Sequence, residues 1–381
     1  MELDFIRFNK FYLTGKEISY INDSLQNEKI SGDGKYNKLC EEFFERNYNV
    51  QKAFLTPSCT SALEMAALLL DIKEGDEIIM PSFTFVSTAN AFVLRGAKPV
   101  FADISYETLN ITPEEIKSKI TSKTKAVVVV HYAGVSCEMD KIINICSENK
   151  IYLIEDAAHA INAKYQDRFL GSFGDIATFS FHDTKNITCG EGGAILINNK
   201  DLIERAEIIR EKGTNRSKFF RGEVDKYTWV DIGSSYLLNE VSAAFLYAQL
   251  LEVESITNAR VKLWNEYFIK LKKLQDIGIL KLPTIPTYAT HNAHNFYILL
   301  ENVEKRDSLL NFLRKDGIYA VFHYVPLHNS PAGKNYSPNL TLPITETVSE
   351  RLLRLPLYPD LSLDNLHKIV QRVYEFFKIK N

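Results

Sequence analysis

The segment Ser180-Phe-His-Asp-Thr-Lys-Asn-Ile-Thr-Cys-Gly-Glu-Gly-Gly193 decides how this chain is interpreted. It places Lys185 in a loop between two strand-like runs, 175–181 and 193–198, beside a glycine-rich turn that lets other groups approach closely. A lysine in such a loop can hold an aldehyde cofactor covalently. Most lysines, however, are solvated, and the glycines from Gly190 onward also suit an ordinary turn. The rest of the chain must therefore decide between these two interpretations.

The composition is that of an ordinary globular protein. The chain has 381 residues, 45% of them hydrophobic, which is enough to bury a large core and to form two domains. Its 45 basic and 48 acidic residues are spread evenly and give a net charge of -3. We therefore expect no nucleic-acid partner and no attraction to an anionic membrane.

Targeting and metal signals are missing from the sequence. The N-terminus lacks the pattern of a signal peptide and no apolar run is long enough to span a bilayer, so we expect a cytoplasmic protein. The five cysteines are scattered, without a CxxC pair, which predicts reduced thiols and no metal site.

Short β-branched runs alternate with helical patterns in the first part of the chain. Such alternation predicts an α/β fold with a largely parallel sheet, in which ligands bind beyond the carboxyl ends of the strands. The later part has a long helical stretch, which predicts a connecting helix pair, and the pattern of a small α+β domain. We expect a large cofactor-binding domain with an N-terminal arm over 1–250, and a connecting helix with a small C-terminal domain over 251–381. The predicted strands are 77–80, 98–103, 125–130, 151–154, 295–300 and 319–324, and the long helical stretch is 237–274.

Two strand-end features suit a phosphorylated planar ligand. The polar helix start at 56–61 offers free amides and hydroxyls to a phosphate, although Ser58 or Thr60 can also serve only as an N-cap. Phe85 follows the strand 77–80 and can lie against a planar ring. We prefer Phe85 to Phe83 for this role, while a phenylalanine near a strand end is also a common core residue.

Two further features suit a pyridine ring and its aldehyde. The strand 151–154 runs into Glu155 and Asp156, and strand alternation sends their side chains to opposite faces, so one of them meets a ligand. Asp156 can pair with a protonated ring nitrogen, or serve as a helix cap or surface acid. Ser180 can add a hydrogen bond to the phosphate. Together with Lys185, these features predict pyridoxal phosphate as cofactor.

Several specific stretches resemble the DegT/DnrJ/EryC1/StrS family of sugar aminotransferases. They are EKGTNR (211–216), FFRG (219–222), DKYTW (225–229), VFHY (321–324) and SERLLRLPL (349–357), and the resemblance runs from about Leu13 to Leu361. It implies the type I pyridoxal-phosphate-dependent aminotransferase fold, with a mixed, mostly parallel sheet in the large domain and a smaller C-terminal α+β domain. It also implies a homodimer whose active sites are shared between subunits.

The resemblance implies a role for each candidate residue. Lys185 would be the catalytic lysine, Asp156 the partner of the ring nitrogen and Phe85 the stacking ring. Cys59, Thr60 and Ser180 would hold the phosphate. His159 falls beside the ring, where a structural histidine is equally expected.

The chain departs from the family at one motif. Many members carry Asn-x-Arg in a loop that reaches the neighbouring subunit, and here Ser235 and Leu237 occupy those positions. Ser235 remains a candidate for contacting the cofactor, but the contacts of the usual motif do not carry over directly.

The resemblance implies C4 transamination of TDP-4-oxo-6-deoxy-D-glucose by L-glutamate. The product would be TDP-4-amino-4,6-dideoxy-D-galactose, for surface polysaccharide. Candidate contacts to the sugar nucleotide, each of which can instead be an ordinary solvated group, are Lys212, Asn215, Arg216, Arg221, His323 and His328.

Other functions remain open at this stage. An equatorial amine would give the gluco epimer, and a relative with another specificity would aminate C3 of a 3-oxo isomer; spacing in the sequence does not separate these. Dehydratases of the same fold carry histidine in place of Lys185. A non-enzymatic sugar-nucleotide sensor is disfavoured by the intact set of candidate residues. A nicotinamide dehydrogenase is disfavoured because no GxGxxG opens a helix.

Overall fold

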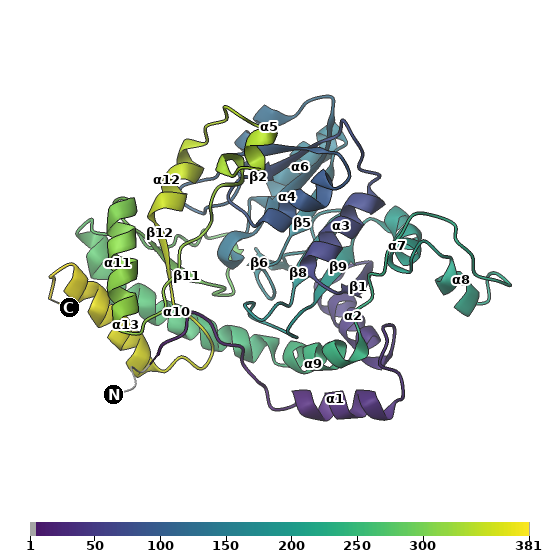
Figure 1. Cartoon of the computed structure of the whole chain (residues 1–381), viewed down its shortest axis with the longest axis horizontal. Helices are drawn as coiled ribbons and strands as arrows, with labels where there is room; N and C mark the ends of the chain where they lie inside the picture. Colours follow the sequence, from purple (N-terminus) through teal and green to yellow (C-terminus); the bar gives the residue numbers. More distant parts are fainter. Residues whose placement is uncertain (1–4, 381) are drawn as a thin grey trace.

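A seven-stranded sheet forms the centre of the computed structural model, which describes residues 5–380 (Figure 1). Only β9 runs antiparallel to its neighbours, and the other six strands run in one direction. The prediction of an α/β fold with a mixed, mostly parallel sheet is therefore confirmed. In sheet order the strands are β1 (Lys52–Thr56), β9 (Gly193–Ile197), β8 (Ile176–Ser180), β5 (Tyr152–Asp156), β4 (Thr124–Val130), β2 (Glu77–Pro81) and β3 (Lys98–Ala102).

Both faces of the sheet are covered by helices. Along β4 alternate side chains belong to different cores: Val127 and Val129 pack with α2, α5, α6 and α9, whereas Ala126 and Val128 pack with α3, α4 and α7. A strand buried on both faces reads as a continuous apolar run, which explains the four consecutive valines. The helices are α2 (Lys35–Tyr48), α3 (Cys59–Leu69), α4 (Val86–Val93), α5 (Pro113–Lys119), α6 (Met139–Asn149), α7 (Ile203–Arg210) and α9 (Glu240–Leu251).

The C-terminal part has a core of its own, to which the N-terminal segment contributes Ile6. Ile6 exchanges backbone hydrogen bonds with Gly317 and Tyr319, so the N-terminal segment packs on the C-terminal part of the chain. The boundary between domains at residues 250 and 251 remains a prediction. The elements of this part are α10 (Val253–Asp276), β11 (Phe296–Leu299), α11 (Val303–Lys315), α12 (Pro343–Arg351), β12 (Leu352–Leu355) and α13 (Leu363–Phe376).

The long helical stretch is a pair of helices, α9 and α10, separated at Glu252, as expected. One detail differs from the sequence predictions. The segment 319–324 is not a regular strand, because only Val321 makes a bridge, to Arg354 of β12. The remaining elements are α1 (Glu17–Gln26), α8 (Arg216–Phe220), β6 (Lys164–Tyr165), β7 (Arg168–Phe169), β10 (Ala289–Thr290) and the short 3-10 turns η1 (Tyr132–Gly134), η2 (Lys200–Leu202), η3 (Leu327–Asn329) and η4 (Gly333–Asn335). Within residues 5–380, no helix combines the length and apolar character needed to cross a membrane.

Candidate active site

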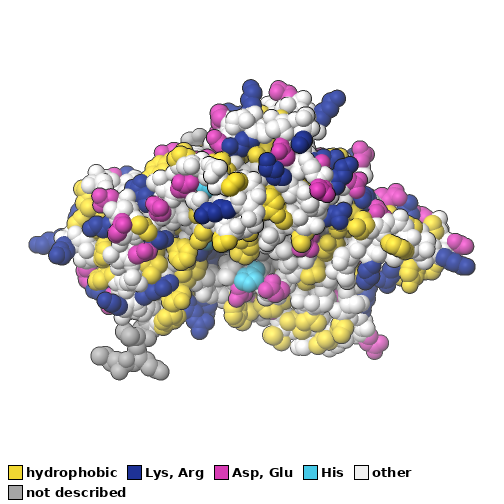
Figure 2. Space-filling view, turned by 45° about the horizontal axis from the view of Figure 1, so that its top comes forward, with side chains coloured by type: hydrophobic (Ala, Val, Ile, Leu, Met, Phe, Trp, Pro, Cys, Tyr) yellow, Lys and Arg dark blue, Asp and Glu magenta, His cyan; other side chains and the backbone are white. Residues whose placement is uncertain are grey.

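A cavity of about 600 Å³ lies at the carboxyl ends of β4, β5 and β8. The space-filling view shows a hollow on one face of the molecule, with histidine and acidic side chains beside it (Figure 2). The cavity brings together eight of the candidates named from the sequence, which come from segments as far apart as α3 and the loop before α12. They are Cys59, Thr60, Phe85, Asp156, His159, Ser180, Lys185 and His323.

The start of α3 forms one wall of the cavity. Ser58 is the N-cap, and its Oγ accepts a hydrogen bond from the amide of Ser61 at 3.0 Å. The amides of the first helical turn have no partner within the helix, and the helix dipole adds partial positive charge there. The hydroxyls of Thr60 and Ser87 share a hydrogen bond of 2.8 Å, which joins the starts of α3 and α4. This wall therefore offers amides and hydroxyls to an anion such as phosphate.

Asp156 ends β5 with its carboxylate against the start of α4. Its Oδ2 accepts a hydrogen bond from the Thr88 hydroxyl at 2.7 Å, and its Oδ1 accepts one from the Ala158 amide at 3.2 Å. Burial raises the pKa of Asp156, against the opposing effect of the Thr88 hydrogen bond. A buried carboxylate in this setting is stabilised by a cation placed beside it, such as a protonated ring nitrogen.

The neighbouring acid, Glu155, points away from the cavity. It accepts hydrogen bonds from the amides of Gly171, Phe173 and Gly174 and contacts Nε2 of His131 at 3.0 Å. Although burial raises the pKa of Glu155, these hydrogen bonds, above all that of His131, bring it below its ordinary value. The prediction that the side chains of Glu155 and Asp156 point to opposite faces of the sheet is confirmed.

Lys185 lies in the loop between β8 and β9, where its amide donates to the carbonyl of His182 at 2.9 Å. Burial lowers the pKa of its amine, opposed by the neighbouring Cys59 and Asp156 and assisted by the positive charge of Arg354. A lowered pKa increases the fraction of neutral amine, which is the form that attacks a carbonyl or accepts a proton.

Phe85 and Phe83 have different surroundings. Phe85, the N-cap residue of α4, is 58% exposed and lines the cavity, whereas Phe83 is 1% exposed and packs against Tyr132 and Tyr324. Only Phe85 has a face free for a ligand ring.

Two histidines among the candidates line the same cavity. The ring of His159 stacks on that of His294 with centroids 4.0 Å apart, and its buried Nδ1 has no hydrogen-bond partner in the described part of the chain. Nδ1 of His323 shares a hydrogen bond of 3.1 Å with the Tyr132 hydroxyl. Burial holds the pKa of both imidazoles well below the usual range, so both are neutral at pH 7.

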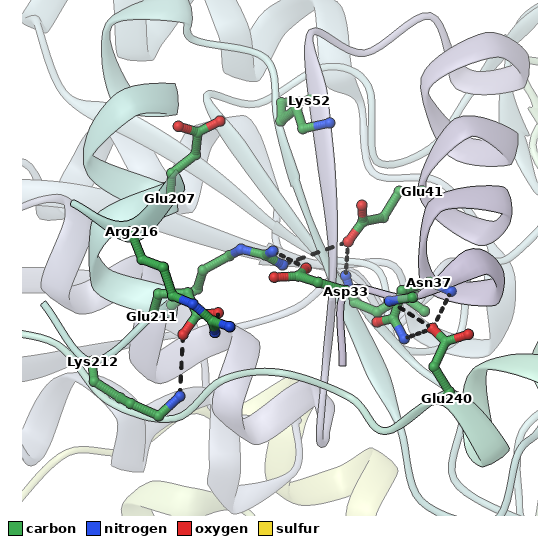
Figure 3. Close-up of polar contacts among 12 residues, drawn as sticks. Asp33, Asn37, Glu41, Lys52, Glu207, Glu211, Lys212, Arg216 and Glu240 are labelled. Carbon is green, nitrogen blue, oxygen red and sulfur yellow. Dashed lines mark hydrogen bonds and ion pairs between the residues drawn. The ribbon is translucent and has the colours of Figure 1, made fainter. Parts of the chain in front are cut away.

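The other candidates lie outside this cavity. Lys212 and Arg216 both pair with Glu211, at 3.2 and 2.9 Å, beside a second cavity that Asp33, Glu41 and other charged side chains line (Figure 3). Ser235 is exposed and bridges to Glu211. Arg221 pairs with Glu207 and Glu223, and Asn215 accepts a hydrogen bond from the Thr228 amide.

His328 is buried between two polar partners. Its Nδ1 shares a hydrogen bond of 2.7 Å with Ser82 Oγ, and its Nε2 contacts Glu346 at 2.9 Å. Both ring nitrogens are thus occupied by the protein, away from the cavity, which is the arrangement of a structural histidine.

Some residues that line the cavity were not predicted. Thr88 is ordinary in a helix start, and its role depends on Asp156, 68 positions away. Arg354 lies inside the stretch SERLLRLPL and Tyr324 inside VFHY; both stretches were singled out for the family resemblance, without a role for these two residues. Phe8 and Asn295 also line the cavity, and no local pattern singles them out.

Comparison with known proteins gives one consistent result. The model of the DegT/DnrJ/EryC1/StrS aminotransferase family matches residues 12–374. GDP-perosamine synthase of Escherichia coli O157:H7 is 33% identical over 370 residues, covering 97% of each chain. Among solved structures, the aminotransferase TlmJ from Streptoalloteichus hindustanus has a TM-score of 0.90 at 28% identity, covering 98% of this chain and 99% of that one. PseC of Helicobacter pylori, an aminotransferase in pseudoaminic acid biosynthesis, has a TM-score of 0.88 at 27% identity, covering 98% and 100%.

The residues around the cavity fit pyridoxal phosphate, the cofactor of these aminotransferases. At Gly193, a Cβ would lie 2.4 Å from the carbonyl carbon of Ser58, so β9 approaches the start of α3 closely because this residue has no side chain. The buried carboxyl of Asp156 and the buried amine of Lys185 line the same space. A phosphate site, an acid and a lysine are thus present together.

Proposed function

Because the chain belongs to the DegT/DnrJ/EryC1/StrS aminotransferase family, whose members are pyridoxal-phosphate-dependent sugar aminotransferases, we propose that it aminates C4 of TDP-4-oxo-6-deoxy-D-glucose. L-glutamate is the amino donor and TDP-4-amino-4,6-dideoxy-D-galactose the product, made in the cytoplasm for surface polysaccharide. The observation that carries most of the proposal is that Lys185 and Asp156 line one cavity with a helix start beside them. The choice of sugar rests on the stretches of sequence between 211 and 357.

Each residue of the cavity has a definite task in this reaction. Pyridoxal phosphate, when bound, supplies an aldehyde that accepts an amino group and a ring that spreads negative charge. The amides of Cys59 and Thr60 and the Ser180 hydroxyl hold its phosphate, and Phe85 covers one face of its ring. Asp156 keeps a proton on the ring nitrogen.

Lys185 moves the proton that transamination requires. In the first half-reaction its Nζ takes the proton from Cα of the amino donor, and in the second it delivers a proton to C4 of the sugar. Its lowered pKa favours the neutral amine that can accept this proton. The apolar walls contributed by Leu355 and Leu357 limit the access of water.

The candidates outside the cavity belong to the same proposal through a homodimer. Lys212, Asn215, Arg216 and Arg221 lie on the segment that contains α8, which projects from the body of the subunit (Figure 1). Phe220 and Trp229 of this segment are among its exposed apolar side chains, which suits a surface that a second copy covers. We propose that this segment, with Ser235, reaches the cavity of the second copy and contacts the sugar nucleotide there.

The test is a product analysis of the purified enzyme with pyridoxal phosphate, L-glutamate and TDP-4-oxo-6-deoxy-D-glucose. The proton couplings at C4 are read by NMR. A small coupling between H3 and H4 is expected, because it identifies the axial amine of the galacto product; a large coupling identifies the gluco epimer and overturns the stereochemical part.

Two parallel substrates test the rest of the assignment. A GDP-linked 4-oxo sugar is included because a relative is named GDP-perosamine synthase, and a TDP-linked 3-oxo isomer tests the position of amination. Preference for either one overturns the proposed substrate. Lys185→Ala is the control and should lower kcat by about 10³–10⁴-fold or more while still binding the cofactor without a covalent bond; full turnover by this variant contradicts the role of Lys185.

A further inference from the structure

Arg354 is a half-buried cation that has no acidic partner within residues 5–380. It lies on β12, where the preceding Leu353 faces the C-terminal core, so strand alternation sends the Arg354 side chain to the opposite face, and it lines the active-site cavity. Its guanidinium stacks over the ring of Phe8 at 4.6 Å, and Nη2 donates to the carbonyl of Phe322 at 3.3 Å. Its Nε is buried and has no hydrogen-bond partner within residues 5–380.

Arg210, which is buried, shows what an ion-paired guanidinium looks like in this protein. Arg210 makes a short ion pair with Asp33 and a longer one with Glu41, at 3.6 Å. Arg354 forms no ion pair in the described part of the chain, and burial lowers its pKa. A half-buried guanidinium that has no acidic partner in this part of the chain and lines a cavity is suited to an anion that arrives from outside.

The charged side chains that line the cavity narrow the identity of the anion that Arg354 binds. Lys185 and Arg354 are the lysine and arginine side chains that line it within residues 5–380, and Asp156 and Glu191 are the acids. In the proposed function, Lys185 and Asp156 are committed to the cofactor, and the start of α3 holds the phosphate. Arg354 therefore remains available to bind a second anion when the cofactor is bound.

We propose that Arg354 binds a carboxylate of the amino donor. Its guanidinium packs over the ring of Phe8, and its two-pronged set of N–H donors matches the planar geometry of a carboxylate. Asn295, which is buried, lines the same cavity and offers further hydrogen bonds to the donor. The inference rests on the proposed function and makes Arg354 the residue that selects an anionic donor.

The first test measures binding without turnover. Glutarate, a dicarboxylate with no amino group, is titrated into the cofactor-loaded wild type, Arg354→Gln and Arg354→Lys by calorimetry. We expect glutarate affinity to fall by about 30-fold or more in Arg354→Gln, and by less in Arg354→Lys, which keeps the charge but loses the fork. Equal glutarate affinity in the wild type and Arg354→Gln overturns the proposal.

The second test separates the two half-reactions. The change in cofactor absorbance is followed on mixing with L-glutamate alone, and the reverse change is followed when the aminated enzyme meets the oxo sugar. Arg354→Gln should raise the glutamate concentration for half-maximal rate by about 30-fold or more and change the sugar half-reaction little. A defect confined to the sugar half-reaction would instead assign Arg354 to the nucleotide.

A matched control variant and the wild type distinguish failure of the proposed function from failure of the inference about Arg354. Arg314→Gln removes an exposed guanidinium that also stacks on an aromatic ring, that of Tyr319 at 4.9 Å, outside the cavity, and should change neither measurement. If the wild type itself does not exchange amino groups with glutamate, the proposed function fails. If it does and Arg354→Gln keeps normal use of glutamate, only the present inference fails.

Discussion

The hydroxyl of Thr88 donates a hydrogen bond of 2.7 Å to Oδ2 of Asp156, and both side chains are buried. Thr88 lies in the first turn of α4, three residues after the N-cap residue Phe85, while Asp156 ends β5. The bond therefore ties the acid assigned to the ring nitrogen to the helix start that carries the stacking ring. Thr84 extends the contact, because its hydroxyl lies 2.9 Å from that of Thr88.

Thr88→Val should weaken cofactor binding. Burial raises the pKa of Asp156 and the Thr88 hydrogen bond is the largest opposing effect, so its loss raises the pKa further. Since the carboxylate form pairs with the ring nitrogen, we expect about 10-fold weaker binding of pyridoxal phosphate, in line with about 1.5–3 kcal/mol for a hydrogen bond to a charged group. The difference from wild type should grow as the pH falls. Absorbance titrations at pH 6 and 8 measure it; Thr88→Ser, which keeps the hydroxyl, should bind nearly as wild type does.

Truncation of Phe85 should mainly weaken cofactor binding, whereas truncation of Phe83 should mainly lower the stability of the protein. Phe85→Ala removes an exposed ring at the cavity, so cofactor affinity should fall by about 5–10-fold with little change in Tm. Phe83→Ala leaves a cavity in the cluster around Tyr132 and should reduce the free energy of unfolding by about 3–5 kcal/mol. Cofactor titration and chemical denaturation of both variants measure the two effects. A large loss of stability in Phe85→Ala would contradict the placement of its ring.

The parts of the site that the sequence predicted share one property: each is encoded locally. Cys59 and Thr60 begin a helix, Asp156 ends a buried strand and Lys185 follows a strand, and the carboxyl ends of parallel strands meet at one edge of the sheet. Patterns within about ten residues were therefore enough to predict both the sheet and the position of the cavity.

The parts that the sequence missed depend on contacts between distant segments. Arg354 reaches the cavity because β12 lies beside the active site and Phe8 of the N-terminal segment stacks on its guanidinium. His328 was proposed to contact the substrate, whereas Ser82, 246 positions away, occupies one of its nitrogens. Local composition gives no sign of either contact. The contacts of charged and polar residues outside strand ends were therefore the hardest to predict.

Gly193→Ala should disturb the phosphate site more than the sheet. A Cβ at this position would lie 2.4 to 2.6 Å from backbone atoms of Ser58 and Cys59, which cannot move without shifting the start of α3. We expect at least about 10-fold weaker cofactor binding and a loss of about 1–3 kcal/mol of stability. Gly190→Ala is the control, because a Cβ there meets nothing within 4 Å and costs only the strain of its positive φ. Equal effects of the two variants on cofactor affinity would count against the close approach at Gly193.

Glu41 should make the stability of the protein depend on pH near neutrality. It lies in the second, charged cavity (Figure 3), and burial raises the pKa of its carboxyl to about 7, opposed by the charges of Arg210 and Lys52. A pKa that is higher in the folded than in the unfolded protein contributes stability that is fully present below the unfolded value, about 4.5, and is lost as the pH rises through 7. From pH 5 to 8, the free energy of unfolding of the wild type should therefore fall by about 2–3 kcal/mol relative to Glu41→Gln. Urea denaturation of both proteins across this range measures the difference, and parallel pH profiles would show that Glu41 titrates normally.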